Sequence, residues 1–350
     1  VKLPAVASAT DTGFWMYYGN ASAGSQEDVP NVWDTGFKGV WHLHDDTLDS
    51  TTNANHGTPT GTTNASPGEI ADGQAFNGTS DYIQTPSTEL KTADSMTVSV
   101  WFKADSTTPR HLLWQGGSSY NGWGNGLCCG TEPEMNLSFG TIRSTAPVPD
   151  YLSFFLSDTD EEDSGGDSLH IDVPFTETTS WHQAVAVVTN LSTSPAATLY
   201  VDGVAVGSDT GTTTRTARGA WDTPLRIGRP GVSDRYFDGN LDEVRISSVA
   251  RPLTWVQTEY NNQADPSAFC VFCDTAAIPD TLTLADHASG QAPDAFSTTT
   301  PATATLFRFR LTRLGTVTVD TLRVGLTTGA GIGDSDVTAG ELWEDTNGNG

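Results

Sequence analysis

The stretch Met96-Thr97-Val98-Ser99-Val100-Trp101-Phe102-Lys103 decides the fold class. Apolar side chains recur at every second position from Met96 to Phe102, and a strand places such positions on one face of a sheet. The Thr and Val residues of this stretch also favour strands. We therefore expect a half-buried β-strand here, with one face on a hydrophobic core.

Similar short apolar runs recur on both sides of this strand, separated by segments rich in Gly, Asp and Asn. The runs expected to form strands are 40–43, 73–76, 81–84, 111–115, 135–139, 151–156, 182–188, 197–201, 225–228 and 241–246. Asp202-Gly203 between two such runs predicts a hairpin with a type I′ turn, which needs positive φ at both central residues. The best helix candidate is 252–261, with one or two turns. This pattern predicts an all-β sandwich or jelly roll.

Several runs carry short motifs that follow one another in a fixed order. The motifs are 39–43 (GVWHL), 49–57 (DSTTNANHG), 73–78 (GQAFNG), 81–83 (DYI), 97–102 (TVSVWF), 180–185 (SWHQAV), 199–203 (LYVDG) and 237–246 (FDGNLDEVRI). Each motif is weak alone, whereas the ordered set is highly specific. In this set the chain resembles bacterial laminin-G-like, concanavalin A-like jelly-roll domains. The resemblance implies a concanavalin-like jelly-roll sandwich over residues 36–263, about two-thirds of the chain.

Two flanking regions complete the expected organisation. Residues 1–35 contain one strand-like run, 13–19. The segment 15–20 resembles the last strand of an uncharacterised module that often precedes this domain in bacterial surface proteins. Residues 264–281 are expected to be a linker, and residues 282–350 a second, incomplete β-sandwich unit. The first residue is not Met and no signal peptide is visible, so we expect a piece of a longer protein.

Charge and hydrophobicity restrict the partners. The formal net charge is -26. Phosphate binding needs a cationic face, so neither nucleic acid nor an anionic membrane surface is expected as a partner. No run of about 18 apolar residues is present, so no transmembrane segment is expected. The acidic surface suits a salt-tolerant extracellular protein, and we expect a location outside the bacterial cell or on its surface.

Four cysteines are present: Cys128, Cys129, Cys270 and Cys273. An even number in a chain of secreted character favours disulfides, and four cysteines allow three connectivities, among which the sequence does not choose. A metal pair or free thiols are the alternatives. The Cys-x-x-Cys spacing at 270–273 has no second copy and no nearby His cluster, which disfavours zinc.

Calcium is the expected cofactor. The ion binds carboxylate, amide and carbonyl oxygens, and the loop at 49–57 offers all three. The resemblance implies that Asp49 and Asp242 meet at one metal, with loop carbonyls near Asn53 and Asn55 completing the shell. The alternative is that Asp49 and the two Asn residues cap turns, as these residue types often do.

Two further acidic segments could hold a cation. Asp345, Asn347 and Asn349 match the first positions of an EF-hand-type calcium loop, whose later ligands would lie beyond residue 350. The alternative is an Asx-rich turn. The acidic run 158–163, followed by Asp167, is expected to be a solvated loop, with a weak cation site or an interaction surface as the alternative.

An aromatic loop is the candidate ligand site. Tyr120, Asn121, Trp123 and Asn125 combine rings, on which flat sugar faces can stack, with amide donors. The alternative is that Trp123 packs over the edge of the sandwich beside the two adjacent cysteines.

Catalysis is not expected. Glycosidases need two carboxylates that face each other across a groove. Related glucanases carry Glu-x-Asp-x-x-Glu on one strand, a spacing that is absent here. Glu132 and Glu134 flank Pro133 in a loop rich in Gly and Cys. The seven His residues form no His-Glu-x-x-His motif.

The sequence therefore predicts a non-catalytic binding or adhesion module of a large extracellular bacterial protein. Its expected partner is a glycan or a cell-surface or matrix protein. The alternative is a structural subunit of an extracellular fibre or pilus-like appendage, which would self-assemble through open sheet edges. A glycoside hydrolase is the third possibility.

Overall fold

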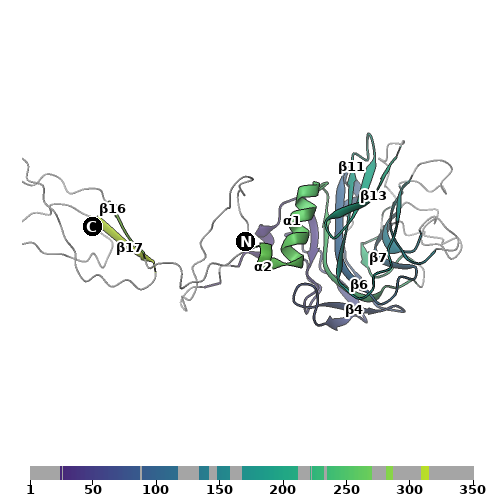
Figure 1. Cartoon of the computed structure of the whole chain (residues 1–350), viewed down its shortest axis with the longest axis horizontal. Helices are drawn as coiled ribbons and strands as arrows, with labels where there is room; N and C mark the ends of the chain where they lie inside the picture. Colours follow the sequence, from purple (N-terminus) through teal and green to yellow (C-terminus); the bar gives the residue numbers. More distant parts are fainter. Residues whose placement is uncertain are drawn as a thin grey trace, which may run out of the picture. The chain divides into compact units, whose positions relative to one another are not determined.

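A computed structural model shows the sandwich and a small part of the second unit (Figure 1). The residues that the structure describes are 24–25, 27–86, 89–116, 134–141, 148–157, 168–211, 221, 223–231, 235–269, 281–286 and 309–314. The chain divides into two units, Val1–Cys270 and Val271–Gly350, and each is considered by itself.

The larger sheet of the first unit has eight strands, and the predicted strand at 96–103 is one of its central strands. In spatial order they are β13 (Val204–Thr210), β12 (Ala196–Val201), β11 (His182–Thr189), β6 (Met96–Ala104), β15 (Asp238–Ser247), β4 (Gly73–Asn77) and β3 (Thr63–Ala65), and β1 (Phe37–Trp41) also pairs with β15. All pairs are antiparallel. β15 follows the other strands in sequence, yet it lies between β6 and β4.

The other sheet has seven strands. In spatial order they are β10 (Leu169–Pro174), β9 (Tyr151–Leu156), β8 (Glu134–Phe139), β7 (Arg110–Gly116), β14 (Arg226–Ile227), β5 (Tyr82–Gln84) and β2 (Thr58–Thr60). Two antiparallel sheets confirm the predicted all-β sandwich. The prediction missed β2 and β3, which have three residues each and no buried side chain, so they lack apolar alternation. It also missed β10, although its apolar residues do alternate.

The hairpin between β12 and β13 has the predicted turn. Val201 pairs with Val204 across it. The two central residues, Asp202 and Gly203, have φ angles of 51° and 73°. Positive φ at both positions defines a type I′ turn, whose twist matches that of the flanking strands.

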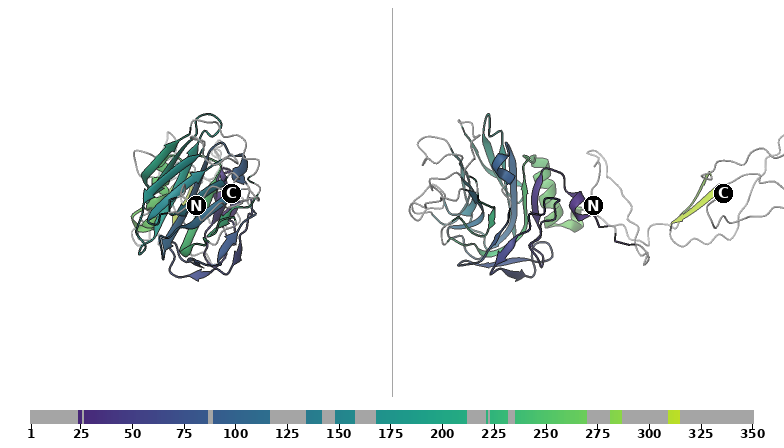
Figure 2. Two further views of the ribbon diagram at one scale, coloured as in Figure 1. Left: turned by 90° about the vertical axis from the view of Figure 1, so that its right-hand side faces the viewer. Right: turned by 180° about the vertical axis from the view of Figure 1, so that it is seen from behind.

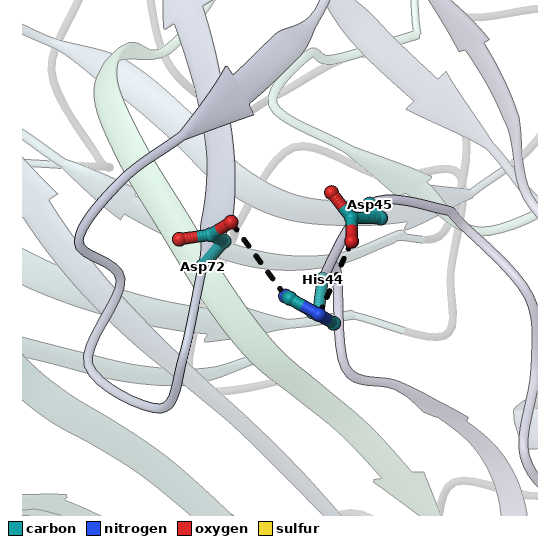
Figure 3. A group of neighbouring side chains, drawn as sticks. All are labelled: His44, Asp45 and Asp72. Carbon is teal, nitrogen blue, oxygen red and sulfur yellow. Dashed lines mark ion pairs between the residues drawn. The ribbon is translucent and has the colours of Figure 1, made fainter.

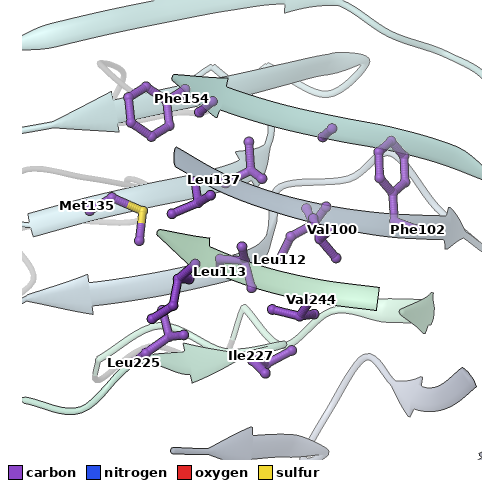
Figure 4. Close-up of a cluster of buried hydrophobic side chains, with 14 of the residues drawn as sticks. Val100, Phe102, Leu112, Leu113, Met135, Leu137, Phe154, Leu225, Ile227 and Val244 are labelled. Carbon is purple, nitrogen blue, oxygen red and sulfur yellow. The ribbon is translucent and has the colours of Figure 1, made fainter. Parts of the chain in front are cut away.

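The hydrophobic core lies between the two sheets (Figure 4). Val100 and Phe102 of β6 face Leu113, Leu137 and Phe154 of the seven-stranded sheet, and all five side chains are fully buried. Because side chains alternate along a strand, the intervening residues of β6 point to the outer face of the eight-stranded sheet.

Helices form a minor part of the described chain. They are the 3-10 helices η1 (Val29–Val32) and η2 (Glu89–Thr92) and the α-helices α1 (Leu253–Ala264) and α2 (Pro266–Phe269). α1 is 12 residues long, longer than the one or two turns predicted. It lies on the outer side of the eight-stranded sheet, away from the seven-stranded one (Figures 1 and 2). No helix within the described residues has the length and apolar character needed to cross a membrane.

The second unit is described only in one strand pair. β16 (Thr281–Asp286) and β17 (Phe309–Leu314) pair antiparallel, with Thr281 opposite Leu314. A strand pair agrees with the β unit expected at 282–350, while the domain boundaries themselves stay a prediction.

Candidate functional site

The outer face of the eight-stranded sheet is covered by α1. Tyr260 of the helix stacks on Trp101 of β6, with ring centroids 5.6 Å apart. The indole Nε1 of Trp101 donates to Oε1 of Gln263 at 2.7 Å. Val256 is fully buried against Val185 and neighbouring apolar residues of the sheet. The helix therefore closes this face to large ligands.

A buried ion-pair network lies under the same helix. Arg245 of β15 donates to Glu259 of α1 at 2.6 Å and to Glu243. Nδ1 of His42 lies 2.6 Å from a carboxylate oxygen of Glu243. Burial alone would raise the pKa of Glu243, but the charges and hydrogen bonds of Arg245 and His42 outweigh it and lower that pKa. The network is internally paired, which is typical of a structural role.

Asp49 of the predicted calcium loop is used as a turn cap. Its Oδ1 accepts hydrogen bonds from the backbone N–H groups of Val40 and Thr51, at 3.0 and 2.9 Å. Its Oδ2 accepts from the Thr51 hydroxyl at 2.9 Å and from the Asn55 N–H at 2.8 Å. The amide of Asn53 donates to the carbonyl of Phe37 at 3.0 Å. The loop is thus tied to β1 from within.

Asp242 serves a different loop. Its Oδ2 accepts from the backbone N–H groups of Glu69 and Ile70, at 3.0 and 2.9 Å, and its Oδ1 accepts from the N–H of Glu243 at 2.8 Å. The side chain is fully buried. Burial raises its pKa to about 7, against the lowering effect of these donors.

These hydrogen bonds bear on the calcium prediction. A carboxylate offers about four acceptor directions, and those of Asp49 are all taken by donors of the chain. Asp49 and Asp242 share no hydrogen-bond partner. In this arrangement the pair does not fit calcium, because the ion would have to displace backbone donors. Calcium at Asp49, Asn53, Asn55 and Asp242 stays a prediction, which titration of chelator-treated protein with Ca²⁺ would test.

A different group of potential metal ligands lies nearby in sequence: His44, Asp45 and Asp72 (Figure 3). Nε2 of His44 lies 3.2 Å from Asp45, and Nδ1 lies 3.8 Å from Asp72. The amide of Asn64 donates to both carboxylates at 2.9 Å. These contacts satisfy the group internally, and exposed acidic groups are common without a metal.

The outer face of the seven-stranded sheet carries a row of polar and aromatic side chains. Residues that pair directly across antiparallel strands lie on the same face. The pairing joins neighbouring strands from β5 to β10 in one line. This line, which we call the polar row, consists of Gln84, Arg226, Trp114, Asn136, Phe155 and His170.

Hydrogen bonds hold several of these side chains in place. Nε1 of Trp114 donates to Oε2 of Glu134 at 2.7 Å. The amide nitrogen of Asn136 lies 3.0 Å from Nε2 of His111. All four side chains are almost completely buried. Buried polar groups in such contacts are fixed in position, which suits a preorganised site.

An arginine and two tyrosines extend this face at the β5 side. The guanidinium of Arg229 lies 4.5 Å from the ring centroid of Tyr82 and 5.4 Å from that of Tyr236. The guanidinium of Arg226 lies 5.3 Å from the ring centroid of Trp114. A hydrogen bond to Thr60 and the charge of Arg229 lower the pKa of Tyr82.

Sequence reasoning missed this face, although one signal was present. On β8 the core residues Met135 and Leu137 alternate with polar residues. The polar residues are Glu134, Asn136 and Ser138. Alternation of this kind marks a face that does not join the core. Which strands lie beside β8, and therefore which residues share its outer face, depends on the topology.

The other predicted site residues lie outside the described part of the chain. They are the loop residues Tyr120, Asn121, Trp123 and Asn125, the C-terminal Asp345, Asn347 and Asn349, the acidic run 158–163 with Asp167, and all four cysteines. Those predictions stay open.

Comparison with known proteins places the domain in a family. The sequence model of the concanavalin A-like lectin/glucanases superfamily matches residues 77–257. No curated protein matches the chain by sequence. A solved structure, domain 4 of AbnA, a GH43 extracellular arabinanase from Geobacillus stearothermophilus in complex with arabinotriose, is 19% identical. It covers 63% of this chain and 96% of its own length, with a TM-score of 0.46.

Two toxin domains also match the chain. The binding domain of Paraclostridial Mosquitocidal Protein 1 is 16% identical, with a TM-score of 0.46. The receptor binding domain of Botulinum Neurotoxin Type G is 11% identical, with a TM-score of 0.43. Each match covers 65% of this chain and 52% of the toxin chain, so this chain spans about half of either. The family model matches just over half of the residues of the chain. The chain therefore belongs to the concanavalin A-like lectin/glucanases superfamily.

Proposed function

We propose that the first unit is a non-catalytic glycan-binding module of an extracellular bacterial protein, and that it binds through the outer face of the seven-stranded sheet. The polar row carries the proposal, because its accessible members Gln84, Arg226 and His170 offer amide, guanidinium and imidazole groups, while the buried Trp114 and Asn136 lie between them on neighbouring strands. Sugars are bound by such hydrogen-bonding groups together with aromatic rings. The opposite face of the sandwich is covered by α1.

A binding role without catalysis is supported by the carboxylates on this face. Glu134 is the only carboxylate on β8, and its Oε2 accepts a hydrogen bond from Trp114. Asp172 of β10 accepts one from the hydroxyl of Ser153 and lies 2.9 Å from His170. Hydrolysis of a glycosidic bond needs a proton donor and a second carboxylate poised on the sugar. Both of these carboxylates are instead engaged with side chains of the sheet.

A glycan array with matched glutamine variants tests the proposal. Gln84 is exposed at one end of the polar row, and Gln257 is exposed on α1. Loss of one neutral hydrogen bond should weaken binding of a hit by about three- to tenfold in Gln84→Ala. Gln257→Ala should bind like the wild type. Equal binding by both variants, or no hit on any glycan, would overturn the proposal.

An assembly role is the second candidate, and a different feature favours it. Among the described strands, β13 pairs only with β12, so it forms an edge of the eight-stranded sheet. Val204 and Val206 on this edge are 62% and 42% exposed. Open apolar edges invite pairing with another chain. Filaments in electron micrographs of the purified chain that disappear in Val206→Lys would support assembly, whereas a monodisperse monomer would argue against it.

A further inference from the structure

Two arginines on the outer face of the seven-stranded sheet have no carboxylate partner among the residues that the structure describes. Arg226 donates through Nη1 to the carbonyl oxygens of Pro230, at 3.1 Å, and Gly231. Arg229 donates through Nε to the carbonyl of Pro230 at 3.2 Å. Carbonyl oxygens orient a guanidinium but do not neutralise its charge.

Two other described arginines, Arg245 and Arg251, do pair with carboxylates. The chain contains 43 acidic and 17 basic residues, so carboxylates are plentiful. Burial lowers the pKa of Arg226, and the positive charge of Arg229 lowers it further. Both causes disfavour the charged form. An anion bound between the two guanidinium groups would raise the pKa of Arg226 and so oppose both causes, because a nearby opposite charge favours the ionised state.

The two tyrosines fix the position of Arg229. A guanidinium over the face of an aromatic ring is attracted by the ring quadrupole, and here Tyr82 and Tyr236 both contribute. Their rings lie 6.4 Å apart. A side chain held in this way loses little conformational entropy when it binds a ligand, so Arg229 is preorganised.

We infer that Arg226, Arg229, Tyr82 and Tyr236, which we call the arginine cluster, form a subsite for an acidic sugar residue that carries a carboxylate or a sulfate. The inference rests on the proposed glycan-binding function and adds the chemical class of the ligand. Guanidinium groups match carboxylate and sulfate oxygens through paired hydrogen bonds. Gln84, directly opposite Arg226 on β5, supplies an amide for a sugar hydroxyl.

The net charge of -26 limits the size of the ligand. A long polyanion would pass over the acidic remainder of the surface and be repelled. At 0.15 M salt, charges more than about 8 Å apart are largely screened. A short acidic oligosaccharide at the arginine cluster would therefore experience the local positive charge more strongly than the distant negative charge.

Titration calorimetry with two trisaccharides tests the inference. The probes are trigalacturonate and the neutral galactotriose, each titrated into the whole chain at 0.15 M salt. We expect the wild type to bind trigalacturonate at least about tenfold more tightly, the effect of one charge-assisted hydrogen bond. Arg229→Gln should lose this preference for the acidic probe. Lys103→Gln removes one positive charge from the other sheet and should retain it.

The remaining arms separate the possible outcomes. Arg229→Lys keeps the charge without the planar group and should retain only part of the preference. A sulfated trisaccharide compared with inorganic sulfate shows whether the sugar itself is recognised, and binding of inorganic sulfate as tightly as the trisaccharide would overturn the inference. Equal affinity for both neutral and acidic probes would overturn the inference alone. No binding of any saccharide would overturn it together with the proposed function.

Discussion

The two outer faces of the sandwich use arginine in opposite ways. Beneath α1, Arg245 lies between Glu243 and Glu259, and every charge has a partner within the chain. On the seven-stranded sheet, Arg226 and Arg229 meet aromatic rings and backbone carbonyls instead of described carboxylates. The first face is thus paired internally, while the second leaves these two arginines without a carboxylate among the described residues. The contrast suggests that the first face serves stability and the second serves binding.

The largest expected effect breaks the paired face. Arg245→Met leaves two buried carboxylates without their cation, and loss of one partner of a buried ion pair costs about 3–5 kcal/mol in free energy of unfolding. Arg229→Met removes no ion pair among the described residues and should cost less than about 1 kcal/mol. Urea unfolding followed by tryptophan fluorescence measures both. Similar losses in the two variants would show that the faces do not differ as proposed.

A pH effect of intermediate size comes from Asp242. Its pKa is raised from 3.8 to about 7 by burial. A raised pKa means that the folded state holds the proton more tightly, so the stabilisation is complete below pH 3.8 and is lost as pH rises through about 7. The Asp242→Asn variant has no carboxyl group to titrate at this position. Relative to this variant, the free energy of unfolding of the wild type should fall by up to about 4 kcal/mol between pH 4 and pH 8.

Unfolding experiments across that pH range measure the difference between the two proteins. Other carboxylates titrate in both, so their contributions cancel in the comparison. A difference that stays constant from pH 4 to pH 8 would mean that Asp242 is ionised throughout, held by the N–H groups of Glu69, Ile70 and Glu243.

The smallest expected effect concerns the packing of α1 on the eight-stranded sheet. Val256→Ala removes two buried methyl groups from the contact between α1 and the sheet, worth about 1–2 kcal/mol. Val206→Ala on the exposed edge strand β13 makes the same chemical change and should stay within about 0.5 kcal/mol. Thermal unfolding of both variants gives the comparison. Equal shifts in Tm would show that the packing of Val256 against the sheet does not contribute measurably to stability.

Sequence reasoning found most of the core strands, although it missed β10, whose apolar side chains alternate strictly. β6 and β9 were predicted almost to the residue because their apolar positions repeat with period 2. α1 was predicted too short for a physical reason. Its buried positions, Val256, Glu259 and Gln263, have helical spacing, but two of them are polar. Glu259 pairs with Arg245, and Gln263 accepts hydrogen bonds from Trp101 and Gln183. The sequence alone does not reveal these partners.

The candidate site was harder to predict than the fold. Tyr82, Arg229 and Tyr236 meet only because β5 and β14 are neighbours, and residues 82 and 229 are far apart in sequence. The loop at Asp49 was recognised, but an Asp followed by Asn residues describes a turn cap as well as a metal ligand. The four donors on its two oxygens show the turn-cap use, and finding them needs coordinates, while calcium binding stays a prediction.

The place of β15 in the sheet has a consequence for biosynthesis. This strand is translated after every other strand of the sandwich, yet β6, β4 and β1 all form hydrogen bonds with it. Until residues 238–247 emerge from the ribosome, each of these three strands lacks its pairing with β15, and the edge that β15 would cover stays open. Pairing between distant segments also closes slowly. The nascent chain is therefore expected to stay unfolded until the domain is nearly complete, and a ribosome stalled before residue 238 should display a protease-sensitive chain.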